Sequence, residues 1–133
     1  MNDSKSLRIL TIDDDPATLR LLNTVVSRNG CRIRRACADS IESVEIARKF
    51  QPHLILLDIT MPGMDGFDAA KALHALDLTD CMVVVFAARA EAKYRARCEE
   101  LGFDHFMMKP VSLIQLQSLI DEASERLLMS ATV

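Results

Sequence analysis

The sequence has no long apolar run, and this absence excludes one class of protein. Its longest uninterrupted apolar stretch, Cys81 to Ala88, has eight residues, whereas a helix that crosses a bilayer needs about 20. The polar N-terminus leads into an apolar stretch that is too short for the hydrophobic part of a signal peptide. We therefore expect no transmembrane helix, no membrane partner and a cytoplasmic location.

The sequence also lacks an excess of basic residues. The net charge is −3 and the pI is near 5.6, so the chain has no general attraction to nucleic acid. Its only tight basic cluster is Arg32, Arg34 and Arg35, which we interpret as a solvated edge. We expect no nucleic-acid partner.

Cysteine patterns that bind metal are absent as well. No C-x-x-C pair occurs, and no histidine lies at zinc-ligand spacing from a cysteine. We predict free thiols, buried or half-buried, at the four cysteines: Cys31, Cys37, Cys81 and Cys98.

What is present is an ordinary globular composition and a regular pattern of elements. At 133 residues the chain is expected to form one domain, with a core over about residues 7–128 and short polar tails. Five apolar, β-rich segments alternate with five segments of helical periodicity. The predicted strands are Arg8–Ile12, Arg32–Cys37, His53–Asp58, Met82–Phe86 and Asp104–Met108. The predicted helices span Pro16 to Gly30, Ser40–Phe50, Phe67–Leu76, Ala90–Leu101 and the segment from Ser112 to about Leu127.

The alternation of strands and helices predicts an α/β fold. Repeated strand-helix units require right-handed crossovers, so the sheet is expected to be parallel and doubly wound, with helices on both faces. Ligands of such open sheets bind beyond the carboxyl ends of the strands. The residues at those ends are therefore the candidates for function.

Acidic residues gather at these strand ends. Asp13, Asp14 and Asp15 follow the first predicted strand, Asp58 ends the third, and Lys109 follows the fifth. Two carboxylates 4 Å apart repel by about 4 kcal/mol at an effective dielectric of 20, so a cation is needed. Oxygen ligands favour Mg²⁺. Its charge and that of Lys109 balance the three carboxylates of Asp13, Asp14 and Asp58.

Such a site has a definite chemistry. A carboxylate beside a hard cation and a lysine can attack a phosphoryl group, because the metal and the ammonium stabilise charge on the phosphoryl oxygens. The product would be an acyl phosphate.

Three stretches of the sequence resemble a known family. Ile9-Leu-Thr-Ile-Asp-Asp-Asp-Pro16, Leu56-Leu-Asp-Ile-Thr-Met-Pro-Gly-Met-Asp-Gly66 and Met108-Lys-Pro110 are similar to the motifs of response-regulator receiver domains of two-component signalling, the chemotaxis-regulator type included. The resemblance covers the chain from Arg8 to Leu128. It implies a flavodoxin-like fold with five parallel strands in the order 2-1-3-4-5.

The resemblance also implies roles for single residues. Asp58 would be the phosphoacceptor, and Lys109 would contact the phosphoryl group. Asp14 and Asp58 would bind Mg²⁺ directly together with the backbone carbonyl of Thr60, while Asp13 would act mainly through water. The bond before Pro110 would be cis, and Asp15 is expected to be a helix cap rather than a ligand.

At one position the sequence departs from the family. Receiver domains usually carry Ser or Thr at the end of the fourth strand, where this chain has Ala87, and no Ser or Thr occurs between Asp80 and Val111. A hydrogen bond to a charged group contributes about 1.5 to 3 kcal/mol. We therefore predict that phosphorylation survives but is coupled less strongly to conformation. Phe106 occupies the place of the family's rotating aromatic; it either still switches or is, with Phe86, only a core aromatic.

The expected function is that of a signalling domain rather than an enzyme, with at most slow self-phosphorylation from small donors and self-dephosphorylation. A histidine kinase or histidine phosphotransfer protein would be the phosphoryl donor. An unknown downstream protein would bind the face formed by the fourth helix, fifth strand and fifth helix, on or near which Tyr94, Arg95, Cys98, His105 and Phe106 are expected. Only Met129 to Val133 follow the last predicted helix, so we expect no DNA-binding output domain within this sequence. The sequence fits a complete single-domain regulator and a receiver from a larger protein equally. The chain is expected to be a monomer or weak dimer.

Three other functions compete with this hypothesis. A phosphorylation-independent interaction module on the same fold would not need the retained acids and Lys109. An aspartate-nucleophile phosphohydrolase of the haloacid dehalogenase type needs a second Asp two residues after the nucleophile, where Thr60 stands. A flavin-binding electron carrier needs a loop that cradles phosphate, but Asp13, Asp14 and Asp15 repel phosphate and no G-x-G-x-x-G motif is present.

Overall fold

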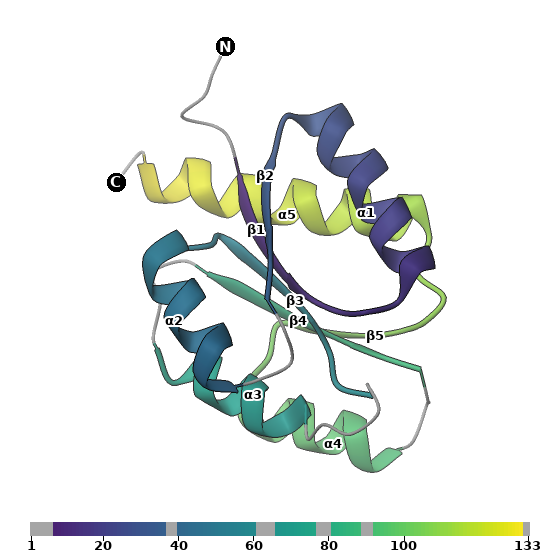
Figure 1. Ribbon diagram of the computed structural model, residues 1–133, viewed down its shortest axis with the longest axis vertical. Coiled ribbons are helices and arrows are strands. Elements are labelled where there is room, and N and C mark those ends of the chain that lie inside the picture. The colour runs from purple at the N-terminus through teal and green to yellow at the C-terminus, as the bar shows by residue number, and fades with distance from the viewer. Residues whose placement is uncertain (1–6, 37–39, 61–65, 77–80, 89–91, 132–133) are drawn as a thin grey trace.

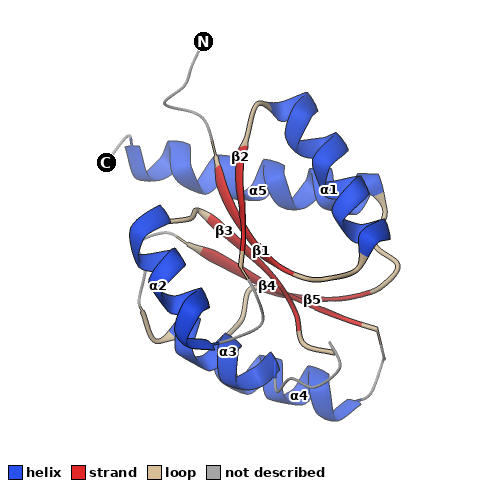
Figure 2. Ribbon diagram, in the orientation of Figure 1, coloured by secondary structure: helices blue, strands red, loops and turns tan. Residues whose placement is uncertain are grey.

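The computed structural model describes residues 7–36, 40–60, 66–76, 81–88 and 92–131. In these ranges, five strands alternate with five helices (Figures 1 and 2). The strands are β1 (Arg8–Ile12), β2 (Arg32–Arg35), β3 (Leu54–Asp58), β4 (Met82–Ala87) and β5 (His105–Met108). The helices are α1 (Pro16–Asn29), α2 (Ser40–Phe50), α3 (Gly66–His74), α4 (Ala92–Leu101) and α5 (Leu113–Ala131).

All strand pairs are parallel, and the order in the sheet is β2-β1-β3-β4-β5. The predicted fold class and strand order are thus confirmed. Because the order reverses at β1, the connections on either side of it run to opposite faces of the sheet. α1 and α5 cover one face, and α2, α3 and α4 cover the other (Figures 1 and 2).

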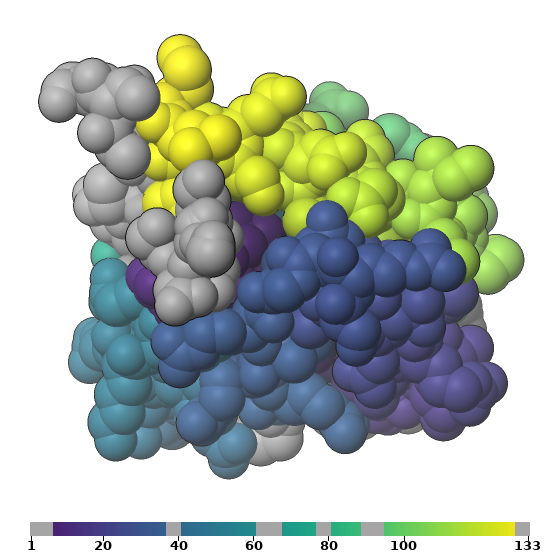
Figure 3. All heavy atoms as spheres, turned by 90° about the horizontal axis from the view of Figure 1, so that it is seen from above, coloured from purple at the N-terminus to yellow at the C-terminus, as the bar shows by residue number. Residues whose placement is uncertain are grey.

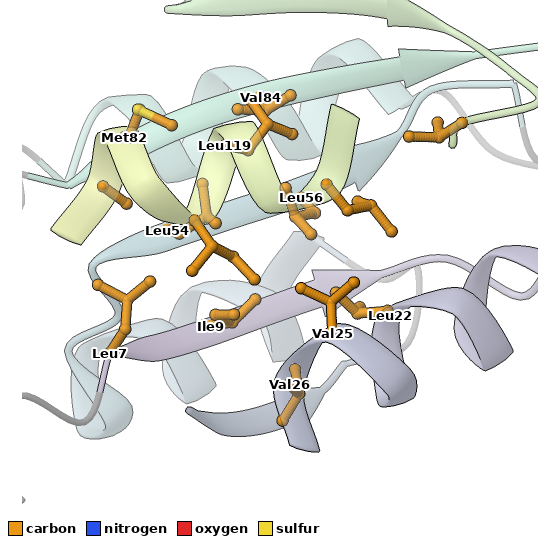
Figure 4. Packing of buried hydrophobic residues seen from close by; sticks show 14 of the residues in the cluster. Leu7, Ile9, Leu22, Val25, Val26, Leu54, Leu56, Met82, Val84 and Leu119 are labelled. Carbon is orange, nitrogen blue, oxygen red and sulfur yellow. The ribbon is translucent and has the colours of Figure 1, made fainter. Parts of the chain in front are cut away.

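Each face of the sheet has its own apolar core. β3 and β4 are buried along their whole length, as expected for strands covered on both sides. On the α1 and α5 face, Ile9, Leu56 and Val84 of the sheet pack with Val25 of α1 and Leu119 of α5 (Figure 4). On the other face the corresponding cluster includes residues of α2, α3 and α4, namely Ala47, Ala69, Ala70, Leu73 and Cys98.

α1 and α5 also lie side by side at the surface (Figure 3). Asn29 and Gln117 exchange hydrogen bonds of 2.9 and 3.0 Å between the two helices. This polar contact joins the two helices that cover that face of the sheet.

Local sequence signals set several helix ends. The Asp15 carboxylate caps α1 by accepting a hydrogen bond from the amide of Ala17 at 3.1 Å, as predicted. Ser112 and Gln115 form a reciprocal capping pair at the start of α5. Gly30 and Gly102 follow α1 and α4 with φ of 66° and 77°, the left-handed conformation that ends a helix at low steric cost.

The structure corrects some predicted boundaries. β2 ends at Arg35 instead of continuing to Cys37, because only its first residues have β1 as a pairing partner. α5 runs to Ala131, so the expected C-terminal tail after Leu128 is mostly helix. His53 lies before β3, where its Nδ1 accepts a hydrogen bond of 2.9 Å from the amide of Arg8.

Two predictions about surface and thiol chemistry can be compared with the structure. The arginines of β2 are exposed, as a solvated edge requires. Cys98 is buried, Cys31 and Cys81 are half-buried, and all three are free, while Cys37 lies outside the described residues. Burial raises the pKa of Cys81 to about 12 and that of Cys98 to about 11, which makes both thiols poor nucleophiles.

Among the described residues, no helix has the length and apolarity needed to cross a membrane.

Candidate functional site

The carboxyl ends of β1, β3 and β5 bring the predicted site residues together. Asp13 and Asp14 follow β1, Asp58 is the last residue of β3, and Lys109 follows β5. Parallel strands end at the same edge of a sheet, so residues 13 and 109 become neighbours although 96 positions separate them. Lys109 is followed by a cis peptide bond to Pro110, which confirms the geometry that the family resemblance implied.

The Lys109 ammonium lies at the centre of the cluster. Its Nζ is 2.8 Å from Asp13 Oδ2, 2.9 Å from Asp13 Oδ1 and 3.0 Å from Asp58 Oδ2. A longer contact of 3.3 Å reaches Asp15 Oδ2. The side chains of Asp13, Asp58 and Lys109 are 1%, 6% and 10% exposed, so these charges interact with little screening by solvent.

Three carboxylates are close enough to share one cation. One oxygen each from Asp13, Asp14 and Asp58 lies within 4.8 Å of the others, with Asp14 exposed and the other two buried. Asp13 Oδ2 is buried and accepts no hydrogen bond from the described residues, although the Lys109 charge is 2.8 Å away. Carboxylate oxygens that cluster in this way are the ligands that a hard cation prefers. The donor set therefore fits Mg²⁺.

The pKa shifts reflect burial and pairing. Burial raises the pKa of Asp13 above its usual value, although hydrogen bonds from Lys109 and from the Asp15 amide oppose this. Burial by itself would lower the pKa of Lys109, but its hydrogen bonds to Asp13 and Asp58 outweigh burial and raise it. Lys109 is thus held as an ammonium. The hydrogen bond from the Thr18 hydroxyl lowers the pKa of Asp15, in keeping with its place as a charged helix cap.

Thr60 and the end of β4 form the other side of the site. The amide and the hydroxyl of Thr60 each donate a hydrogen bond of 2.8 Å to Asp58 Oδ1. The hydroxyl also accepts a bond of 2.9 Å from the amide of Ala88. Ala87 is fully buried in the core cluster on the α2, α3 and α4 face, and its carbonyl accepts a bond of 2.9 Å from the Lys109 amide.

Phe106 is half-buried rather than enclosed. It packs against the same cluster as Ala87, and the Arg95 guanidinium lies 4.9 Å from the centre of its ring. Phe86, by contrast, is only 1% exposed and belongs to the opposite core. The two aromatics therefore have different environments.

The expected partner face is only partly supported. Cys98 is buried, so it lies near this face without being exposed on it. Arg95 is exposed, and His105 is half-buried with its Nε2 2.8 Å from Glu122 of α5. The side chain of Tyr94 lies outside the described residues.

Sequence reasoning missed two contacts at this site. It did not anticipate the reach of Lys109 to Asp15, and it placed Thr60 beside the site without its hydrogen bond to Ala88. The parallel register, in which Asp58 pairs with Phe86, would have indicated the second contact, because it brings position 60 level with position 88. That register was not available from the sequence.

Comparison with known proteins decides the family. The sequence model of the family described as the response regulator receiver domain matches residues 9–121 of this chain. The chain belongs to this family. Receiver domains are signalling domains of two-component systems; they receive their signal from histidine kinases and bind Mg²⁺ at an acidic site.

Curated relatives are larger proteins that contain a similar segment. This receiver domain is 33% identical over 127 residues to the transcriptional regulatory protein PrrA of Mycobacterium tuberculosis, covering 96% of this chain and 54% of that protein. It is 30% identical over 126 residues to the sensor histidine kinase RcsC of Escherichia coli K12, covering 95% of this chain and 13% of the kinase. The chain spans about half or less of the length of these relatives.

Solved structures show the same fold. A CheY-like response regulator receiver domain protein from Methanospirillum hungatei JF-1 aligns with a TM-score of 0.80 at 24% identity, over 94% of this chain and 98% of that one. A receiver domain of a sensor histidine kinase from Pseudomonas aeruginosa PAO1 aligns with a TM-score of 0.74 at 23% identity, over 90% and 98% of the two chains. The latter has a magnesium ion coordinated in its active site cleft.

Proposed function

We propose that this receiver domain accepts a phosphoryl group on Asp58 from a histidine kinase or a histidine phosphotransfer protein. The observation that carries the proposal is the position of Asp58. Its Oδ2 lies 3.0 Å from the Lys109 ammonium, and its carboxylate shares a cluster with Asp13 and Asp14. This arrangement supplies a nucleophile together with the charges that phosphoryl transfer requires.

The proposed transfer exchanges one bond for another. A bond forms between an Asp58 carboxylate oxygen and phosphorus, while the bond between phosphorus and the donor nitrogen breaks and its electron pair stays with that nitrogen. Lys109 stays protonated and is placed to contact the phosphoryl oxygens. Its raised pKa keeps that positive charge throughout the physiological range.

Asp13, Asp14 and Asp58 would hold Mg²⁺, joined by the backbone carbonyl of Thr60. Bound Mg²⁺ would act as a Lewis acid on the phosphoryl oxygens. The three carboxylates and Lys109 sum to a formal charge of −2, which a divalent cation neutralises. Asp15 is bound to its own helix through Ala17 and Thr18 and is not one of the proposed ligands.

Signalling would then pass through protein contacts on the face formed by α4, β5 and α5. Arg95, His105 and Phe106 are the described residues that we propose for this face. In this proposal the domain is a signalling domain, and its only catalytic activities are slow self-phosphorylation from small donors and self-dephosphorylation. A monomer or weak dimer in the cytoplasm fits this role.

Intact mass measurement tests the phosphoacceptor. With Mg²⁺ and acetyl phosphate or phosphoramidate, the wild-type chain should gain one phosphoryl group, and Asp58→Asn should gain none. Asp15→Asn is the matched control, since Asp15 is an acid of the same cluster that should not be needed as acceptor. A label that persists in Asp58→Asn would refute the assignment.

The alternative function is a phosphorylation-independent interaction module, and Ala87 is the observation that favours it. A buried methyl group at the end of β4 offers the phosphoryl group no hydroxyl. If wild-type protein takes up no label while still binding a partner, this alternative replaces the proposal.

Substitutions at Ala87 should measure how much the absent hydroxyl weakens the coupling between phosphorylation and conformation. Ala87→Thr is expected to enlarge the chemical-shift changes that beryllofluoride causes in β4 and β5, because a hydroxyl gains a charge-assisted hydrogen bond. Ala87→Val is the matched control with the same shape and no hydroxyl. Both should be destabilised by about 1 to 3 kcal/mol, since the position is fully buried. Equal shift changes in the two variants would contradict the prediction.

A further inference from the structure

The Thr60 hydroxyl connects Asp58 to the residue that follows β4. Its oxygen accepts a hydrogen bond of 2.9 Å from the Ala88 amide, and its single proton is donated to Asp58 Oδ1 at 2.8 Å. A hydroxyl has one proton to donate and two lone pairs to accept with. Both bonds can therefore exist at once, as a continuous chain from the Asp58 carboxylate to the backbone of Ala88.

The sheet register explains why Thr60 makes this link. Asp58 pairs with Phe86, and the Ile59 amide donates to the Phe86 carbonyl at 3.0 Å. The segments that follow β3 and β4 keep the same register, so position 60 lies opposite position 88. The side chain at 60 thus reaches the backbone at 88 directly.

The side chain of Ala87 cannot make the same link. Its methyl group is fully buried in the core cluster on the α2, α3 and α4 face and carries no polar atom. No Ser or Thr occurs from Cys81 to Val111 in the sequence. A serine or threonine hydroxyl that joins Asp58 to the end of β4 must therefore come from outside that segment, and Thr60 supplies one.

We infer that Thr60 is a positioning residue which transmits the state of Asp58 to the backbone after β4, in place of the hydroxyl that position 87 lacks. This inference rests on the proposed function of Asp58. Phosphorylation of Asp58 removes the carboxylate charge that now accepts the Thr60 hydrogen bond and places a charge of about −1.5 to −2 on the phosphoryl group instead. The hydroxyl then donates to the more strongly charged phosphoryl oxygens, and the Ala88 amide bound to it changes its environment too.

A purely structural role predicts something different. If Thr60 only fastens the end of β3, its loss would loosen the neighbourhood without altering how Ala88 responds to phosphorylation. The response of the Ala88 amide therefore distinguishes the two roles.

The test uses Thr60→Val, which keeps the shape and removes the hydroxyl, with Thr60→Ser as the matched control that keeps it. In the unphosphorylated protein, amide exchange at Ala88 should be about fivefold faster in Thr60→Val, since one hydrogen bond is lost, and close to wild type in Thr60→Ser. If Thr60→Val does not fold, Thr60→Ala serves in its place. Unchanged exchange at Ala88 in the variant without the hydroxyl would overturn the inference.

The second measurement adds Mg²⁺ and beryllofluoride and follows the Ala88 amide by nuclear magnetic resonance at equal occupancy. Wild type and Thr60→Ser should show a shift change at Ala88, and Thr60→Val should lose at least half of it. A full response in Thr60→Val, with wild type labelled on Asp58, would overturn the inference and leave the proposed function intact. A wild type that takes up neither label nor beryllofluoride would overturn both.

Discussion

Replacing Lys109 by methionine is expected to slow the phosphorylation of Asp58 by about 100-fold or more. Lys109 Nζ lies 3.0 Å from Asp58 Oδ2, where its charge can stabilise the phosphoryl oxygens during transfer. Removal of one such preorganised donor typically reduces a rate by about 10²- to 10³-fold. The rate of mass gain with acetyl phosphate and Mg²⁺ measures this effect.

The same substitution should also destabilise the fold. Methionine fills the space of the lysine stem but leaves Asp13 and Asp58 buried without their counter-charge. Breaking a buried pair from one side costs about 3 to 5 kcal/mol. We expect the free energy of unfolding to fall by about 3 kcal/mol in EDTA. The loss should be smaller in Mg²⁺, because a bound divalent ion supplies part of the missing positive charge.

Lys71→Met is the matched control, because Lys71 is exposed on α3 and lies outside the cluster. It should change neither the labelling rate nor the stability by a measurable amount. If Lys109→Met is destabilised equally in EDTA and in Mg²⁺, Lys109 does not act as the counter-charge of a metal site. A wild-type labelling rate in Lys109→Met would refute its contact with the phosphoryl group.

The second large effect is expected at Phe86, where truncation to alanine should cost about 3 to 5 kcal/mol. Phe86 is 1% exposed in the core beneath α1 and α5, and its removal leaves a cavity that the sheet cannot close. The whole domain, at 133 residues, has a stability of about 7 to 20 kcal/mol. Urea unfolding followed by circular dichroism measures the loss.

Phe106→Ala provides the comparison. Phe106 is half-buried and covered on one side by Arg95, so its truncation is expected to cost about 1 to 2 kcal/mol. Phe86→Leu, which keeps most of the apolar volume, should cost less than half as much as Phe86→Ala. Equal losses in Phe86→Ala and Phe106→Ala would show that Phe106 is as much a core residue as Phe86, and would contradict a signalling role for its ring.

The sequence by itself determined the alternation of elements and the residues at the ends of the strands. The apolar runs around Leu56 and Val84 predicted buried parallel strands, because only strands covered on both faces are apolar at every position. Turn and cap residues such as Asp15, Gly30 and Ser112 have local effects on the backbone, so the helix ends that they set could be predicted from neighbouring residues alone.

The cluster of Asp13, Asp58 and Lys109 could also be predicted from the sequence, because it follows from the topology of a parallel sheet. Once the strands are parallel, their carboxyl ends meet at one edge, and Asp13, Asp58 and Lys109 must approach one another. The resemblance to receiver domains added the roles, which await the labelling experiments.

Only the tertiary structure decided which atoms meet. The burial of Cys98, the half-buried position of Phe106 beneath Arg95, and the bridge from Asp58 through Thr60 to Ala88 depend on strand register and on helix packing. A shift of register by one residue turns a side chain to the other face of a sheet, and register is fixed by contacts between residues far apart in the chain. The periodicity of a single segment carries no information about those contacts.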